Sequence, residues 1–302
     1  MTPTDEQSHI LSLANSQDNL LISALAGSGK TSTLEMFERA TKTKPVLYLV
    51  FNKRNAKEAE SRMLFTTTVR TFNSLGHRIW AKATGKNLSL SPKKSQEILR
   101  GIINEVPKRD QGPIWDVFWD VVQGVGMAKA LGYIPEGKYE HAKRLCSQGE
   151  FHASLDESPD DFVSDLIDAV LTKSIRLAYE GNIDYNDQIY MPALFGGTYP
   201  QFPLVMVDES QDLSPVNHAM LDKLGKGRLC AVGDPWQNIY GFRGAKSGGM
   251  ASIADRFRTT SCDLSISFRC PSEIVKHVHW RVPHFKWMKE GGSVEVLDKL
   301  QN

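Results

Sequence analysis

One short glycine-rich segment limits what this chain can fold into more than any other feature. Residues 24–31 read Ala-Leu-Ala-Gly-Ser-Gly-Lys-Thr, between an apolar run at 19–24 and a stretch with helical periodicity at 30–40. A glycine loop that joins a strand to a helix lets backbone N–H groups curl around phosphate oxygens at the positive end of the helix. Its first position, where such loops usually have glycine, is Ala24. The segment predicts a phosphate-binding loop within an α/β fold.

The side chains of this loop predict which nucleotide groups it would hold. Lys30 would reach the β- and γ-phosphates of ATP, and the Thr31 hydroxyl would be a ligand of Mg²⁺. The predicted nucleotide-binding residues of the loop are Ala24, Leu25, Ala26, Gly27, Ser28, Gly29, Lys30 and Thr31.

A second candidate site follows another apolar run. Asp208 and Glu209 come directly after residues 203–207, which read Pro-Leu-Val-Met-Val. At the carboxyl edge of a parallel sheet these two carboxylates would face the phosphate loop. Asp208 would hold Mg²⁺, and Glu209 would orient and deprotonate an attacking water molecule. An isolated acidic turn has the same residues, but its combination with the phosphate loop favours the catalytic interpretation.

Strand and helix patterns alternate at both ends of the chain, and the middle is helical. Apolar runs at 45–51, 203–207 and 228–232 predict buried strands, which together with the intervening helices indicate a parallel α/β sheet. Helical patterns at 92–105, 114–130 and 158–179 predict an insertion without buried strands. The expected parts are 1–80 and 181–270 (two portions of an α/β domain), 81–180 (the helical insertion) and 271–302 (a tail).

Charge is unevenly distributed along the chain. The whole sequence has 36 basic and 35 acidic residues, but residues 39–100 contain 14 basic and 3 acidic ones, and residues 150–212 contain 2 and 13. The division predicts either a basic surface that binds a polyanion or two solvated helical faces of opposite sign. Charge alone leaves these alternatives open.

Composition excludes several classes of protein. No apolar run approaches the length of a membrane span, and the N-terminal residues lack the pattern of a signal peptide. The four cysteines show no metal-site or disulfide spacing. We therefore expect no membrane partner and a cytoplasmic protein of a bacterial or phage-infected cell, or a nuclear one in a eukaryote.

Further segments, in order along the chain, resemble the motifs of UvrD/Rep-like superfamily 1 DNA helicases. Residues 231–245 are similar to nearly the whole of motif III. The similarities run from Gln7 to Arg269, and some variants look closest to F-box-helicase-like and phage members. The other segments are Thr4–Gln7 (Q motif), Val50–Ala59 (Ia), Thr71–Gly76 (Ib), Asp184–Asp187, Asp208–Asp212 (II) and Leu264–Arg269 (IV).

The resemblance implies a RecA-like P-loop NTPase fold and a role for each matching residue. Gln7 would read the adenine edge, and Phe268 would stack on the adenine. Gln237 would sense the γ-phosphate, and Arg269 would stabilise transition-state charge, beside Lys30 and Glu209. Single-stranded DNA would contact Asn52, Thr71, Phe72, Asn73, Tyr240, Phe242 and Arg243.

The chain departs from the family pattern in three places. Asn73 replaces a histidine of motif Ib, and Ser267 replaces an asparagine of motif IV. Nothing after Arg269 resembles motifs V and VI, although residues 292–297 have the pattern of an opening strand of a second RecA-like domain. A fragment, half of a split gene and a natural short form all fit this pattern.

Two functions remain open on the sequence. The first is an ATP-dependent 3′–5′ DNA helicase of the UvrD-like group, acting in DNA repair, replication or recombination on single-stranded or tailed duplex DNA. The second is an ATP- and single-stranded-DNA-binding module without motor activity, which needs a chain that supplies motifs V and VI. An unrelated P-loop kinase explains neither motif III nor the aromatic residues.

Overall fold

A six-stranded parallel sheet forms the centre of the molecule in the computed structural model, which describes residues 2–155, 157–224, 227–237 and 249–295. The strand order is β3-β2-β6-β7-β1-β8. The strands are β1 (Leu20–Ala24), β2 (Val46–Val50), β3 (Thr67–Thr71), β6 (Leu204–Val207), β7 (Arg228–Gly233) and β8 (Thr260–Leu264). The predicted α/β fold with a parallel sheet is confirmed.

Helices cover both faces of this sheet, and the alternation of apolar side chains along each strand explains why. Leu20 and Ile22 pack in one cluster with residues of the first three helices, whereas Leu21 packs in the cluster on the opposite face. On the first face lie α1 (Asp5–Ser12), α2 (Lys30–Ala40) and α3 (Lys53–Arg62). On the second lie α4 (Phe72–Thr84), α10 (Asp187–Phe195), α11 (Pro215–Lys223) and α12 (Gly249–Phe257).

The order of the strands decides which loops meet. In a parallel sheet all carboxyl ends lie at one edge, and ligands bind in the crevice outside that edge. Strand β1 lies between β7 and β8, and β6 lies next to β7. The segments that follow these four strands are therefore neighbours, while those that follow β2 and β3 lie farther along the same edge.

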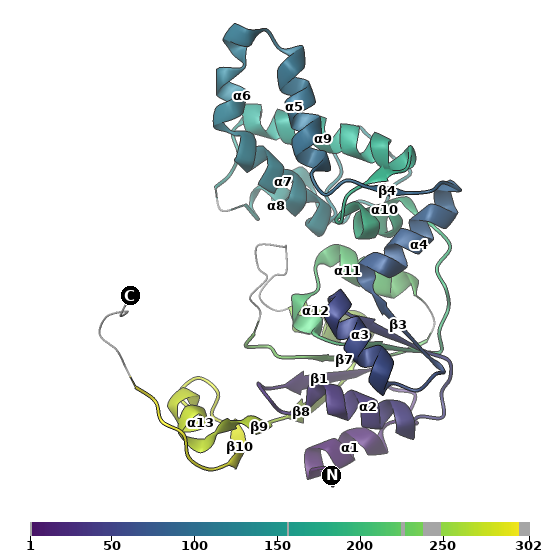
Figure 1. Cartoon of the computed structure of the whole chain (residues 1–302), viewed down its shortest axis with the longest axis vertical. Coiled ribbons are helices and arrows are strands. Elements are labelled where there is room, and N and C mark those ends of the chain that lie inside the picture. The colour runs from purple at the N-terminus through teal and green to yellow at the C-terminus, as the bar shows by residue number, and fades with distance from the viewer. Residues whose placement is uncertain (1, 156, 225–226, 238–248, 296–302) are drawn as a thin grey trace.

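A group of helices stands above the sheet (Figure 1). It consists of α5 (Lys94–Glu105), α6 (Gly112–Asp116), α7 (Phe118–Leu131), α8 (Gln148–His152) and α9 (Asp161–Tyr179). The short strands β4 (Ser89–Leu90) and β5 (Asn182–Ile183) pair where the chain enters and leaves this group. We propose that it is the helical insertion expected at 81–180, flanked by the two portions of one ATPase domain.

Buried charges attach this insertion to the loop before α10. Lys129 Nζ lies 2.6 Å from Asp184 Oδ2 and 2.7 Å from Asp187 Oδ1, and Lys94 Nζ lies 2.6 Å from Asp187 Oδ2. Burial disfavours the charged form of Lys129, but the two aspartates outweigh it and raise the pKa of Lys129. Burial lowers the pKa of Lys94. The four side chains form a neutral network between α5, α7 and the 184–187 turn.

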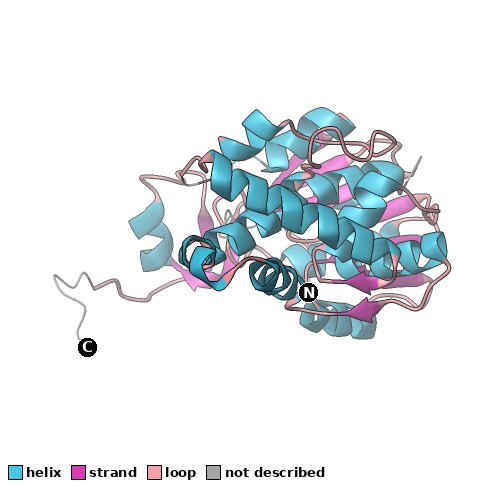
Figure 2. Ribbon diagram, turned by 90° about the horizontal axis from the view of Figure 1, so that it is seen from above, coloured by secondary structure: helices cyan, strands magenta, loops and turns pink. Residues whose placement is uncertain are grey.

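The last described residues form a small C-terminal unit of β9 (Ile266–Pro271), α13 (Ser272–Val278) and β10 (Lys286–Lys289). Figure 2 shows it to one side of the main body. The predicted strand at 292–297 is wrong for residues 292–295, which form no strand. The strand of this unit is Lys286–Lys289, which lies parallel to β9. Residues 296 and 297 lie outside the described part. Gly291 and Gly292, both with positive φ, turn the chain away after β10.

Among the described residues, no helix combines the length and apolar character that crossing a membrane requires.

Candidate nucleotide site and adjoining groove

The loop after β1 has the backbone of a phosphate cradle. Gly27 has a φ of +72° and Gly29 a φ of +84°, values that glycine adopts without a steric penalty. Gly29 is the N-cap of α2, and no side chain caps the first N–H groups of this helix. These N–H groups point out of the helix end and carry its partial positive charge. The predicted loop, from Ala24 to Thr31, is therefore arranged to receive an anion.

Lys30 of this loop meets the acidic end of β6. Lys30 Nζ lies 2.9 Å from Glu209 Oε2, and 15% of the Lys30 side chain and 29% of the Glu209 side chain are exposed. Glu209 has a left-handed backbone (φ 52°), which is uncommon for a residue other than glycine and recurs at functional sites. The two motifs predicted to cooperate thus lie in direct contact.

Asp208 lies deeper than Glu209. Its Oδ2 accepts a hydrogen bond of 2.9 Å from the Tyr48 hydroxyl, and its Oδ1 accepts one of 2.9 Å from the Glu209 N–H. Burial and the neighbouring Glu209 charge raise the pKa of Asp208 to about 6. A cation at this position would offset both effects, because an opposite charge nearby favours the ionised carboxylate.

Gln211 connects this acidic segment with the end of β7. Its Nε2 donates to Glu209 Oε2 (2.9 Å), and its Oε1 accepts from the Asp234 N–H (3.0 Å). A Cβ added at Gly233 would lie 2.6 Å from Gln211 Oε1, so only glycine fits there. Gln237 lies at the end of this described segment, where its N–H donates to the Asp234 carbonyl at 3.1 Å. The exposed Gln237 side chain is thus near the site, at the entrance rather than in the Lys30–Glu209 contact.

The segment after β8 packs directly on the phosphate loop. The Ser267 hydroxyl donates to the Ala26 carbonyl (2.9 Å), and the Phe268 N–H donates to the Gly27 carbonyl (2.9 Å). The Phe268 ring is 38% exposed and would lie 3.6 Å from a Cβ at Gly29. Arg269 is exposed, and its Cβ lies next to Gly27. Phe268 and Arg269 therefore stand beside the loop as predicted, and Ser267 anchors them.

Gln7 also lies beside the loop, at Gly29. It is the N3 residue of a capping box at α1, in which its Oε1 accepts from the Thr4 N–H. Its Nε2 donates to the Thr33 hydroxyl at 3.0 Å. Gln7 is 5% exposed. An adenine contact by Gln7 would therefore require that one of these bonds be exchanged.

The predicted DNA-binding residues after β2 and β3 line two adjoining hollows. One, of about 530 Å³, lies between α7 and the segment after β6, and the other, of about 600 Å³, lies between α3 and α4. Asn73 lines both hollows. Asn52 lines only the second, where its side chain caps α3, and so does Thr71, which caps α4. Phe72 is 3% exposed, so its ring contributes mainly to the core and offers only an edge to the first hollow.

Sequence reasoning missed a better-placed aromatic residue. The Tyr185 side chain is 52% exposed and lines both hollows, and its carbonyl accepts a 2.7 Å hydrogen bond from Asn73 Nδ2. Tyr185 belongs to the turn that the buried lysines hold. The Asp-Tyr-Asn-Asp similarity was the available signal for it. Tyr48 and Gln211, which hold the two carboxylates, were likewise not singled out.

Three predicted DNA-binding residues, Tyr240, Phe242 and Arg243, lie outside the described residues. No group of three metal-ligating side chains occurs in the described ranges. A Mg²⁺ ion bound to nucleotide phosphates needs only one or two protein ligands, so Thr31 and Asp208 suit it chemically.

Comparison with known proteins shows which proteins this chain is similar to. Residues 161–258 match the UvrD/REP helicase N-terminal domain. DNA helicase IV of Escherichia coli is 27% identical over 315 residues, which cover 87% of this chain and 44% of that protein. These matches show that the chain is similar to UvrD-like helicases. PcrA of Bacillus subtilis is 24% identical, over 92% of this chain and 40% of PcrA. F-box DNA helicase protein 1 of Schizosaccharomyces pombe is also 24% identical, over 92% of this chain and 32% of that protein.

The chain spans less than half the length of these relatives. Its similarity to DNA helicase IV covers 87% of the sequence, which includes most of the sheet and of the helical group.

Proposed function

We propose that this UvrD-like chain binds ATP–Mg²⁺ and single-stranded DNA, hydrolyses ATP, and serves as the ATP-binding lobe of a DNA helicase. The observation that carries the proposal is the Lys30–Glu209 contact, 2.9 Å across two segments 179 residues apart. It joins a phosphate loop to a carboxylate that is suited to activate water.

In this proposal the phosphates of ATP bind the N–H groups of the loop and the start of α2. Lys30 turns from Glu209 toward the phosphates, and Glu209, still held by Gln211, accepts a proton from the attacking water. Thr31 and Asp208 would hold Mg²⁺, which neutralises phosphate charge when bound. Arg269 and Gln237 would contact the γ-phosphate, and Gln7 and Phe268 the adenine.

Single-stranded DNA would bind in the two hollows beside Tyr185. Lys53 and Arg70 line the second hollow together with Tyr185, and a basic groove with an exposed aromatic ring is typical of sites that hold a polynucleotide without reading its sequence. Asn52, Thr71 and Asn73 would contact the backbone at this edge. Tyr240, Phe242 and Arg243 would complete the groove, and the activity would be cytoplasmic or nuclear.

A second candidate is a binding module without motor activity of its own. The observation that favours it is that the described residues contain one six-stranded sheet and, after it, only the two strands β9 and β10. Translocation requires two lobes that open and close on the nucleotide. The helicase function, its 3′–5′ direction and a partner chain with motifs V and VI are therefore parts of the proposal that need separate tests.

The test is ATP hydrolysis measured with and without oligodeoxythymidylate, together with a fluorescence titration of labelled oligonucleotide from low to high salt. We expect hydrolysis that DNA stimulates, and binding that is independent of sequence and weakens steeply with salt. Affinity that is equal at low and high salt, or an absence of ATP binding, would contradict the proposal.

A further inference from the structure

Beyond the two hollows, we infer that a strip of cations on α4 binds the continuing phosphate backbone of the single strand held there. The strip consists of Arg78, Lys82 and Lys86 and is called the α4 basic strip. The inference rests on the proposed function, because it extends the DNA path of that site.

The strip has a regular geometry. Arg78 and Lys82 are exposed and four residues apart on α4, so they lie on one face about 6 Å apart along the helix axis. The buried face of the same helix contains Leu75, Ile79 and Trp80. Lys86 follows the helix directly after Gly85, whose φ of +67° ends α4. The three cations thus extend from the middle of α4 to just beyond its end.

The cations of this strip are not neutralised by the protein. Within the described part of the chain, Arg78, Lys82 and Lys86 make no ion pair, and each is exposed. Many other exposed cations do pair, for example Arg62 with Glu58 and Lys276 with Glu273. Exposed cations without partners in a row repel one another and attract a polyanion.

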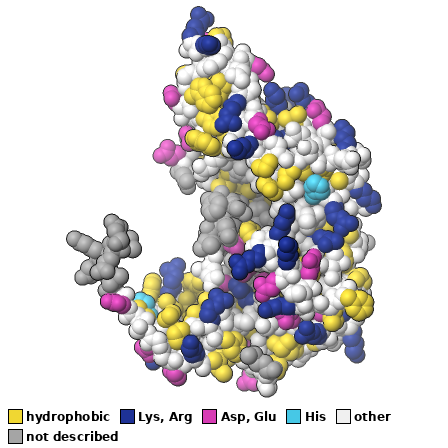
Figure 3. All heavy atoms as spheres, viewed as in Figure 1, with side chains coloured by type: hydrophobic (Ala, Val, Ile, Leu, Met, Phe, Trp, Pro, Cys, Tyr) yellow, Lys and Arg dark blue, Asp and Glu magenta, His cyan; other side chains and the backbone are white. Residues whose placement is uncertain are grey.

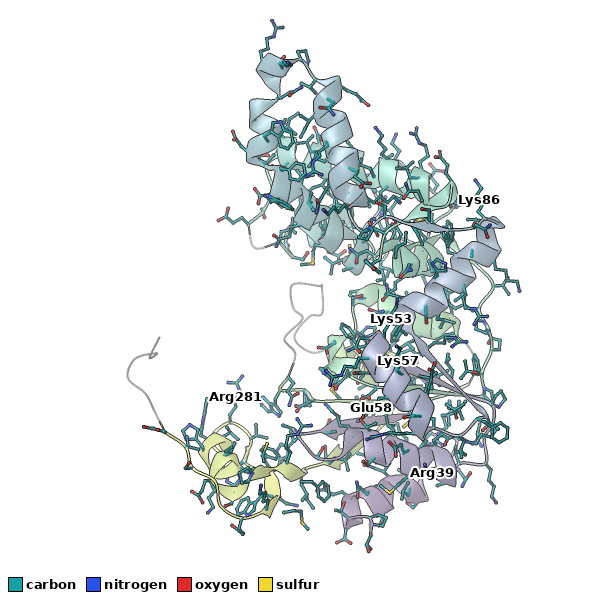
Figure 4. All side chains as sticks on the ribbon, in the orientation of Figure 1. Arg39, Lys53, Lys57, Glu58, Lys86 and Arg281 are labelled. Atoms are coloured by element: carbon teal, nitrogen blue, oxygen red, sulfur yellow. The ribbon has the colours of Figure 1, made fainter. Side chains whose placement is uncertain are left out.

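The strip continues the groove. Arg78 itself lines the second hollow, opposite Lys53 at the start of α3. Figure 4 labels Lys53 and Lys57 on α3 and Lys86 at the far end of α4, and Figure 3 shows basic side chains gathered over this part of the surface. A strand that leaves the second hollow past Arg78 would next meet Lys82 and then Lys86.

Oligonucleotides of two lengths distinguish binding at the strip from binding in the two hollows. The Lys82→Gln/Lys86→Gln variant leaves Arg78 and both hollows intact, and its control, Lys108→Gln/Lys138→Gln, removes two exposed cations from the helical insertion that make no ion pair within the described residues. Affinity for labelled oligodeoxythymidylate of about 6 and about 20 nucleotides is measured against salt, and thermal melting checks the fold. A single-strand phosphate contact contributes about −0.7 to the slope of log K against log salt.

We expect the Lys82→Gln/Lys86→Gln variant to bind the long oligonucleotide about tenfold more weakly near 0.1 M salt. Its salt slope should fall in magnitude by about 1.4, the value for two phosphate contacts. The short oligonucleotide and the control variant should behave like the wild type.

Three results would overturn the inference while leaving the proposed function intact: unchanged binding of the long oligonucleotide, equal weakening at both lengths, or equal weakening by the control. A blunt duplex is tested in the same way. If the wild type binds it as tightly as the long oligonucleotide, and the Lys82→Gln/Lys86→Gln variant loses affinity for both equally, the strip binds duplex DNA instead. A wild-type chain that binds neither oligonucleotide would contradict the proposed function as well.

Discussion

At the scale of residues, the Glu209 carboxylate accepts hydrogen bonds from two different side chains. Glu209 Oε2 accepts from both Lys30 Nζ and Gln211 Nε2, at 2.9 Å each. Phosphate oxygens that enter the loop would compete with Glu209 for Lys30. They would not compete for Gln211, which would keep its hydrogen bond to Glu209. In the proposed function, Gln211 would therefore keep Glu209 oriented while Lys30 changes partner, so Lys30 would bind the nucleotide and Glu209 would activate water.

This separation predicts different losses for the two residues. Glu209→Gln should retain ATP affinity but lose about 10²–10⁴-fold in hydrolysis, because an amide cannot accept the proton of the attacking water. Lys30→Ala should lose ATP binding itself. Fluorescent-nucleotide titration and phosphate release measure the two effects. The exposed Glu180→Gln change is the control and should alter neither, and normal turnover in Glu209→Gln would show that another group is the base.

A buried histidine gives the fold a pH dependence of its own. Burial and the nearby Arg256 lower the pKa of His218 to about 4, from an ordinary value of 6.5. Since the unfolded state binds the proton more readily, stability is complete above pH 6.5 and decreases as the pH falls toward 4. Between pH 7 and 5 the loss from this group is about 2 kcal/mol.

The His218→Gln variant should therefore lose about 2 kcal/mol less than the wild type over that interval, because it has no proton to take up. Chemical denaturation at the two pH values measures the difference. His284→Gln, at an exposed position, is the matched control and should follow the wild type. An identical pH dependence in wild type and His218→Gln would contradict the assignment.

The contact between the phosphate loop and the acidic segment was predictable from two contiguous motifs, whereas the side chains that hold these motifs were not. The spacing around Lys30 and around Asp208 predicted two halves of a nucleotide site, and the structure brings these halves into contact. Tyr48 was read as core because it lies inside an apolar run, yet its hydroxyl donates to Asp208. Such a pairing depends on the register of β2 against β6, which no local pattern encodes.

At the scale of elements, the strands of the main sheet were predicted best. Continuous apolar runs are typical of parallel strands buried on both faces, and β2, β6 and β7 lie within a residue or two of their expected bounds. That β8 is followed at once by β9 was not predicted from the sequence. Ser265 separates these two strands: its N–H and hydroxyl donate to the Glu6 carboxylate, and the chain then leaves the main sheet as β9.

Buried charges hold the helical insertion against the rest of the fold, so removing one of them should lower the stability of the protein strongly. Lys129→Met should destabilise the protein by about 3–5 kcal/mol, because Asp184 would lose the lysine that neutralises it in a buried site. The denaturation midpoint measures this. Lys173→Met, which removes the exposed Lys173–Glu105 pair, is the control and should cost no more than about 1 kcal/mol.

The same substitution should also affect the groove, since Lys129 holds the turn that carries Tyr185. We expect weaker binding of single-stranded DNA in Lys129→Met, with ATP affinity retained under conditions where the variant is folded. A loss of stability no larger than that of Lys173→Met would show that the network contributes little to holding the insertion.

At the scale of the whole molecule, the C-terminal unit contacts both the phosphate loop and the segment after β7. Leu25 packs in a cluster with Val275 and Phe285. The Arg281 guanidinium, on the unit labelled in Figure 4, lies 5.3 Å from the Trp236 ring centroid, next to Gln237. The unit therefore touches both segments that would respond to nucleotide, and movement of either would be transmitted to it.

Movement of one small unit is not sufficient for translocation along DNA. A motor must grip DNA at two places that alternate, and the described residues form one groove, at the carboxyl edge of one sheet. Arginines that reach the nucleotide from a facing lobe are worth about 10³–10⁵ in rate, and Arg269 supplies at most one.

We expect the 302-residue chain to bind ATP–Mg²⁺ and single-stranded DNA, to hydrolyse ATP slowly, and to leave a tailed duplex intact in a strand-displacement assay. A full-length UvrD-like helicase run in parallel provides the positive control. Robust ATP-dependent displacement by this chain alone would show that its single lobe and C-terminal unit are sufficient for unwinding.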